Sequence, residues 1–271
     1  MSRLANSMAL YGALISLSIR AQMQYRVSFL LMSLGQFVTT GVEAVGLWAL
    51  FARFGSLGVW SLPQVAMFYG VVNVSFAIAE AIDRGFDVFG PQYVRTGNFD
   101  RVLLRPRTTV LQLFGHELTM MRVGRLIQGL IVLVWAWHAL DLPVGPRQLL
   151  LVFAAVGGAV CLFVGLVILQ ATLAFWTVES LEVMNTVTYG GVETAQYPLS
   201  IFQQDFRRFF TFVVPLGCVA YFPVVALMDV HDPLGSGRWL QSLAPLAGVL
   251  FLGGALLVWQ WGVRRYTSTG S

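Results

Sequence analysis

Six stretches of about 20 or more largely apolar residues constrain this sequence more than any other feature. They cover roughly 27–51, 63–82, 120–140, 147–175, 209–228 and 240–262. A helix of that length crosses the roughly 30 Å hydrocarbon core of a bilayer. Only 11% of the 271 residues are charged, whereas soluble domains carry about 25%. We therefore predict an all-α polytopic membrane protein with about six transmembrane helices. Residues 1–271 would form a single membrane domain, with the helical bundle over 27–262.

The positive charges predict the orientation of this bundle. All 17 basic residues are arginine. If the N-terminus is cytoplasmic, six spans place all of them on the inner side except Arg53, Arg147 and Arg238. Because basic residues gather on the cytoplasmic side of membrane proteins, we expect both termini and the tail 263–271 in the cytoplasm. The two longer loops, 83–119 and 176–208, would lie there too. The net charge of +4 then reflects topology and does not predict a nucleic-acid partner.

The segment before the first span has a different pattern. Within residues 4–25, a polar stripe at helical spacing contains Asn6, Ser16, Arg20 and Gln24, and the other positions are mostly apolar. This pattern predicts an amphipathic helix along the cytoplasmic interface, so that 1–26 precedes the bundle. The alternative is a seventh span, which would move the N-terminus to the outside.

Tryptophans and two arginines lie near the ends of the predicted spans. Arg122 and Arg125 fall in the first turns of the third span, and we expect their guanidinium groups to extend to the interface. Tryptophans favour both membrane interfaces. The predicted outer ends hold Trp48, Trp60, Trp135, Trp137 and Trp239, and the inner ends hold Trp176, Trp259 and Trp261.

The sequence contains no recognisable catalytic motif. A P-loop needs a lysine to reach the β- and γ-phosphates, and the chain has no lysine. The GxSxG and HExxH patterns are absent as well, so we predict no enzyme activity and no metal site. Glu43 lies well inside the first span. An intramembrane carboxylate favours a substrate path or a proton relay, but Glu43 could equally be solvated near the outer interface or paired locally.

The loop after the second span has the clearest local pattern. Gly97 favours a left-handed turn, and Pro106 would end any helix before it. A short amphipathic helix, Phe99 to Leu104, is predicted between them. Such a helix could dock into a groove on a soluble partner, or it could lie at the interface with its arginines extended into water.

Three separated stretches resemble one family. VRTGNFDRVLLRPRTTVLQLFG (94–115) is similar to the signature of bacterial ABC-2-type permeases, in which a basic residue, a glycine, Phe/Leu-Asp and LLRP follow the second span. YPLSIFQQDFRRFFTFVVPLGCVAYFPVVAL (197–227) resembles the YP-x-x-I-F … F-x-x-P … Y-x-P pattern of the same family. The C-terminal WGVRRYTSTGS (261–271) resembles its Arg-Tyr-x-Ser-x-Gly ending.

This resemblance implies the transmembrane subunit of an ABC exporter in a bacterial inner membrane. Two permeases, identical or homologous, would sit on two copies of a separate ATPase. That partner would bind ATP and Mg²⁺, so no cofactor is expected in this chain. The N-terminal helix and the loop after the second span would contact the ATPase. Carried onto this sequence, the docking candidates are Arg95, Gly97, Phe99, Asp100, Arg101, Leu104, Arg105 and Pro106.

Two other functions remain open from the residues alone. The chain could be a membrane scaffold or immunity factor that moves no substrate, although its short outer loops do not favour a receptor. It could also be an ion-coupled secondary carrier that uses Glu43, although no inverted repeat is visible in the sequence. The sequence does not identify the substrate.

Overall fold

The computed structural model describes residues 19–115, 119, 122–177 and 181–267, together with Gly12, Ser16 and Leu17. This part of the chain is helical and contains no β-strand, only an isolated bridge between Leu57 and Trp60. The predicted all-α fold is therefore confirmed. Most of the predicted interfacial helix 4–25 lies outside the described residues, and its described end, 19–23, is helical.

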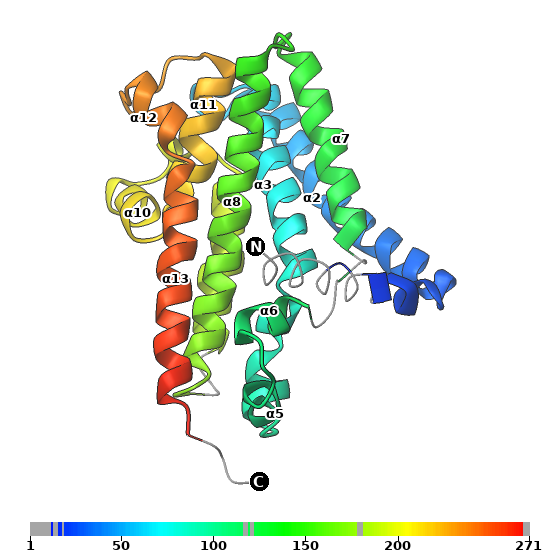
Figure 1. The fold of residues 1–271 in the computed structure, drawn as a ribbon. Helices are drawn as coiled ribbons and strands as arrows, with labels where there is room; N and C mark the ends of the chain where they lie inside the picture. Colours follow the sequence, from blue (N-terminus) through cyan, green and yellow to red (C-terminus); the bar gives the residue numbers. More distant parts are fainter. Residues whose placement is uncertain are drawn as a thin grey trace.

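Five longer helices run side by side along the molecule (Figure 1). They are α2 (Arg26–Phe54), α3 (Leu62–Ile82), α7 (Val123–Ala139), α8 (Pro146–Leu173) and α13 (Leu246–Arg265). By length and composition, four of them can cross a membrane: α2, α3, α8 and α13. The helix α7 has 17 residues and is shorter than the third span that the sequence predicts.

The predicted fifth span, 209–228, is not one straight helix. The helical turns α10 (Gln204–Arg208) and η4 (Phe209–Val213) meet η5 (Gly217–Tyr221) and α11 (Phe222–Met228) at 84°. Pro215 lies at this bend, and proline interrupts a helix because it lacks an N–H donor and clashes with the preceding turn. Counted as one broken span, this pair would bring the number of candidate spans to five.

The segment that follows α8 crosses the bundle. The helix α9 (Leu181–Ala195) lies within the predicted inner loop 176–208. The Tyr189 ring of α9 packs against Phe76 near one end of α3, with 5.7 Å between ring centroids. After α9, the Ser200 hydroxyl accepts a 2.9 Å hydrogen bond from Trp60 Nε1, beyond the other end of α3. The prediction of an inner loop over 176–208 was therefore wrong.

This crossing changes the sides on which some charges lie. Arg207 in α10 interacts electrostatically with Tyr221, whose ring is 6.2 Å from that of Trp60. Arg207 and its neighbour Arg208 therefore follow the crossing and no longer count among the arginines of the predicted inner end. The remaining arginines still favour the orientation that the sequence predicts.

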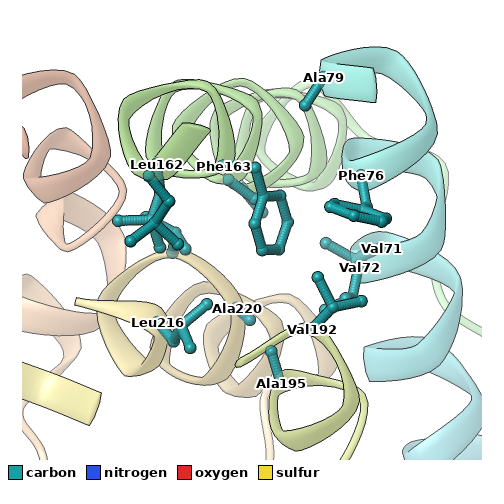
Figure 2. Packing of buried hydrophobic residues seen from close by; sticks show 14 of the residues in the cluster. Val71, Val72, Phe76, Ala79, Leu162, Phe163, Val192, Ala195, Leu216 and Ala220 are labelled. Carbon is teal, nitrogen blue, oxygen red and sulfur yellow. The ribbon is translucent and has the colours of Figure 1, made fainter. Parts of the chain in front are cut away.

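One continuous apolar core joins α3, α8, α9 and η5 (Figure 2). At its centre, Phe163 of α8 meets Phe76 with 5.2 Å between ring centroids. The helices α8 and α13 approach so closely that a Cβ atom on Gly248 would lie 2.0 Å from the Gly158 carbonyl oxygen. Small residues at such crossings allow close helix packing in membranes.

Shorter elements cap the two ends of the bundle. At the predicted inner end lie α4 (Arg84–Asp87), η1 (Gly90–Val94), α5 (Phe99–Leu103) and α6 (Thr109–Phe114). The turn η3 (Leu199–Ile201) and α12 (Arg238–Leu243) belong to the opposite end. The buried tryptophans Trp60 and Trp259 are only 2% and 0% exposed, so the expectation that they anchor the membrane interface was wrong.

Candidate functional site

The loop after α3 folds into a platform built from α4, η1, α5 and α6, called the loop platform below. It lies at the end of the bundle where α13 ends (Figure 1). Gly97 has a φ of +69°, as the predicted left-handed turn requires. A Cβ atom on Gly85 would lie 2.1 Å from the Leu113 carbonyl oxygen, so glycine is needed where α4 meets α6. The predicted short helix is present as α5.

An aromatic anchor holds the loop platform to the bundle. Phe99 packs edge-on against Phe89 and against Tyr266, with 5.0 Å between centroids in each pair. The Trp259 ring lies 4.9 Å from that of Phe89, and its Nε1–H donates a 3.0 Å hydrogen bond to Thr109 Oγ1. Phe99 and Trp259 are both fully buried. The platform is therefore fixed to the final turns of α13 and to the chain just beyond it.

The docking candidates divide into two groups by exposure. Phe99 is buried in the aromatic anchor, so it positions the other candidates and presents no surface itself. Gly97 and Asp100 are half-buried. Five are exposed, namely Arg95, Arg101, Leu104, Arg105 and Pro106, and the Leu104 side chain is 85% exposed.

A basic hollow of about 770 Å³ lies in the loop platform. Arg101, Arg105 and Arg107 line it, together with residues of η1 and α6. Guanidinium groups bind carboxylates through paired, charge-assisted hydrogen bonds. The hollow therefore suits an acidic surface. Sequence reasoning did not include Arg107 among the docking residues, although it follows the Arg-Pro pair directly.

A buried ion-pair network joins α2, α3 and α7. The Glu80 carboxylate lies 3.0 Å from a guanidinium nitrogen of Arg122 and 3.5 Å from one of Arg125. Arg125 Nε donates a 2.9 Å hydrogen bond to Asn73 Oδ1. Arg122 Nη1 donates one of 3.1 Å to Gln36 Oε1. The expectation that both arginines extend to the interface was wrong for Arg125, which is 7% exposed.

This network carried a weak signal in the sequence. Asn73 and Glu80 are seven residues apart and share one face of α3. Arg122 and Arg125 are three apart and point the same way.

At the end of α3, Asp83 is 3% exposed. Burial, together with the charges of Glu80 and Asp87, raises the pKa of Asp83 well above its ordinary value.

Glu43 lies partly buried on α2, where it faces other helices. Its carboxylate interacts electrostatically with Arg125 on α7 and with Glu193 on α9. The nearby Tyr69 hydroxyl donates a 2.9 Å hydrogen bond to the Thr40 carbonyl oxygen. One buried carboxylate oxygen of Glu43 has no hydrogen-bond partner. Of these neighbours, Tyr69 and Arg125 are buried and Glu193 is exposed.

A polar face of α9 was missed in the sequence because the segment was assigned to a loop. Thr186, Tyr189 and Glu193 are exposed on this helix, while Val192 and Ala195 point into the core. A carboxylate on the exposed face of a bundle helix is unusual in a membrane protein. Because Glu193 interacts electrostatically with Glu43, the two residues lie on the same side of the bundle.

The family assignment follows from a comparison with known proteins. The model of the ABC-2 family transporter proteins matches residues 37–270. The chain belongs to the ABC-2 transporter family. This ABC-2 protein is therefore a multi-pass membrane protein of a transport system, as the three sequence stretches implied. The match includes Glu43, the loop platform and α9. No significant match was found among curated proteins or among solved structures.

Proposed function

We propose that this ABC-2 protein is the permease subunit of an ATP-driven exporter in a bacterial inner membrane. It would pair with a second permease, identical or homologous, and sit on two copies of a separate ATPase that binds ATP and Mg²⁺. The loop platform and both termini would face the cytoplasm. The observation that carries this proposal is the platform itself, whose exposed basic residues surround a fully buried Phe99.

The anchor gives the platform a way to transmit force. Because Phe99 packs against Tyr266 and lies with Phe89 and Trp259 in one cluster, a push on α5 reaches the end of α13 directly. The Phe89 ring also contacts Phe175, which follows α8, at 5.2 Å. The ATPase would then favour one state of the permease pair by making different contacts in the two states.

Glu43 on α2 and the polar face of α9 support a path between two permeases. A charged side chain at the bilayer centre costs about 2.5 kcal/mol or more, so Glu43 and Glu193 are poor neighbours for lipid. Helix α2 is also largely uncovered within the protomer, since only 11% of its apolar stretch is buried. A second permease over this face would remove both carboxylates from lipid and place them along a shared path.

The test of docking is co-purification with the proposed ATPase partner, co-expressed with the permease. Arg101→Glu and Arg105→Glu reverse two charges in the basic hollow, and we expect each to weaken ATPase association at least tenfold. Asp100→Arg with Arg101→Glu tests the same surface. Arg147→Glu is the matched control, because Arg147 is an exposed arginine at the first turn of α8, and it should leave association unchanged.

Reconstitution tests the transport step. With its ATPase in proteoliposomes, the permease should move substrate only when ATP is hydrolysed. If both hollow variants bind the ATPase as tightly as the wild type, the docking surface is elsewhere. If the reconstituted complex moves nothing with ATP, the chain acts as a scaffold. Transport driven by an ion gradient without ATP, and lost in Glu43→Gln, would indicate a secondary carrier.

A further inference from the structure

A small cavity lined by buried side chains lies where the loop platform meets the bundle. Residues from the end of α3, from α4, from the chain at the start of α7, and from α8 and α9 form its walls. Its volume is about 20 Å³, and a space of about 10–15 Å³ is enough to hold one water molecule. The cavity therefore has room for one small ligand.

Four polar atoms of the lining residues have no hydrogen-bond partner within the described part of the chain. They are Asp83 Oδ2, Thr119 Oγ1, Thr188 Oγ1 and Arg122 Nε. The residues Asp83, Thr119 and Thr188 are only 3%, 8% and 2% exposed, so bulk water does not reach these atoms. Buried polar groups without a partner are rare in folded proteins and destabilise them. A ligand in the cavity would supply the missing partners.

Asp83 is the carboxylate of this cavity that lacks a basic partner. Arg84 is paired with Asp87 at 2.6 Å, and the two arginines at the start of α7 both contact Glu80. Among the described residues, Asp83 forms no salt bridge. Helix α9 adds Tyr189 to the lining, and α8 adds no titratable group. The cavity therefore places an unpaired acid beside two hydroxyl groups.

We propose that this cavity binds one water molecule and one proton, and that Asp83 carries the proton. The Asp83 O–H and the Arg122 Nε–H would both donate to the water. The water would donate its own hydrogens to the hydroxyl oxygens of Thr119 and Thr188. Because a buried water molecule has two to four polar partners, this arrangement satisfies all four unpartnered atoms at once.

The proton would hold the inner end of the bundle together. Asp83 connects α3 to α4, Thr119 precedes α7, and Thr188 belongs to α9. Loss of the proton leaves a charged carboxylate in a buried site, and burial disfavours the charged form. Since α4 begins the loop platform, a rise in pH at this end would loosen the joint between platform and bundle. The inference concerns the permease alone and does not depend on its ATPase partner.

Infrared difference spectroscopy tests whether Asp83 is protonated. The purified permease in nanodiscs is measured in mildly acidic buffer, where exposed aspartates are ionised. Asp83→Asn should lose a C=O stretching band of a neutral carboxyl group. Thr188→Val, which removes one partner of the water, should shift that band. The control Asp205→Asn removes a carboxylate whose side chain is 99% exposed, and it should leave the band unchanged. A spectrum without this band in the wild type would overturn the proposal.

Thermal unfolding of the same variants tests the consequence. Burial and the charges of Glu80 and Asp87 raise the pKa of Asp83 above its ordinary value of 3.8. The folded wild type should therefore lose stability as the pH rises from 3.8 through the folded pKa. Asp83→Asn is neutral at every pH, so its unfolding temperature should gain on that of the wild type as the pH rises.

Two outcomes would contradict the proton site. One is a difference in unfolding temperature between Asp83→Asn and the wild type that stays constant with pH. The other is a wild-type unfolding temperature that rises when sodium chloride replaces choline chloride, with no neutral carboxyl band. That result would show that the cavity holds a sodium ion against an ionised Asp83.

Discussion

Two arginines share the Glu80 carboxylate inside the bundle. Removing Arg125 leaves Glu80 buried with one remaining partner and also removes the guanidinium group that lies 4.9 Å from the centre of the Phe76 ring. Breaking a buried ion pair by deleting one partner costs about 3–5 kcal/mol. We therefore expect Arg125→Ala to lower the thermal unfolding temperature of the detergent-solubilised protein by many degrees.

An exposed ion pair provides the control for this change. Arg208 and Asp205 are 3.7 Å apart and their side chains are 63% and 99% exposed. Exposed pairs contribute about 0–1 kcal/mol, so Arg208→Ala should unfold close to the wild-type temperature. Similar unfolding temperatures for both variants would show that the Glu80 network does not stabilise the bundle.

Asp232 closes the loop between α11 and α12. Its carboxylate accepts hydrogen bonds from the Tyr221 hydroxyl at 2.6 Å, the Leu234 amide at 2.9 Å, and the amide and hydroxyl of Ser236. Burial alone would raise the pKa of Asp232, but the hydrogen bonds from Ser236, Tyr221 and Leu234 outweigh burial and lower it.

This lowered pKa predicts a pH dependence of stability. A carboxyl group whose folded pKa lies below its unfolded value stabilises the folded state above the unfolded pKa, and the benefit is lost as the pH falls through the folded pKa. The unfolding temperature of Asp232→Asn should therefore lie below that of the wild type at pH values above 3.8. The gap should narrow as the pH falls below that value. A gap that stays constant from neutral to acid pH would contradict this assignment.

At the scale of helices, two glycines on α13 should respond in opposite directions. A methyl group on Gly248 would lie 2.0 Å from the Gly158 carbonyl oxygen, whereas one on Gly253 would meet nothing within 4 Å. Gly248→Ala should push α8 and α13 apart and destabilise the protein by about 1–3 kcal/mol. Gly253→Ala should stabilise it by up to about 1 kcal/mol through helix propensity. Denaturant titration in detergent measures both, and equal effects would argue against this crossing.

The sequence predicted elements well where hydrophobicity or backbone chemistry decides the outcome. Long apolar runs became α2, α3, α8 and α13. The bracket of Gly97 and Pro106 gave α5. The hydrophobicity pattern failed to predict α9, because Glu193 and its polar neighbours lower the hydrophobicity of a helix that has one face away from the core. Hydrophobicity alone also missed the bend at Pro215.

Among the site residues, the sequence predicted exposed positions better than buried contacts. Arg95 and Arg105 of the loop platform follow from the family signature, whereas Arg107 was missed. The burial of Phe99 does not follow from the signature, because it depends on Trp259 and Tyr266 from the far end of the chain. Likewise, the pairing of Arg125 with Glu80 depends on how α3 and α7 pack.

For the whole molecule, the arrangement predicts which positions face each side of the membrane. Single cysteines replace Gln92, Ser56 or Gln203, all exposed, in a chain whose Cys161 and Cys218 are changed to alanine. A membrane-impermeant maleimide added to intact cells should label Ser56→Cys and Gln203→Cys. It should label Gln92→Cys, in the loop platform, only after the membrane is opened.

Each position tests a separate part of this arrangement. Labelling of Gln92→Cys in intact cells would reverse the orientation. Protection of Gln203→Cys alongside Gln92→Cys would show that α9 does not cross, as the hydrophobicity pattern alone suggested. The position at Ser56, between α2 and α3, is the reference for the outer side in both comparisons.

The aromatic anchor also sets an order in time. Phe99 leaves the ribosome long before Trp259 and Tyr266 are translated, so its ring has no complete seat until α13 is inserted. An unfinished chain carries every exposed arginine of the loop platform on a support that is not yet rigid. The last helix therefore completes the platform, and we expect the ATPase of the proposed exporter to bind only chains whose synthesis is complete.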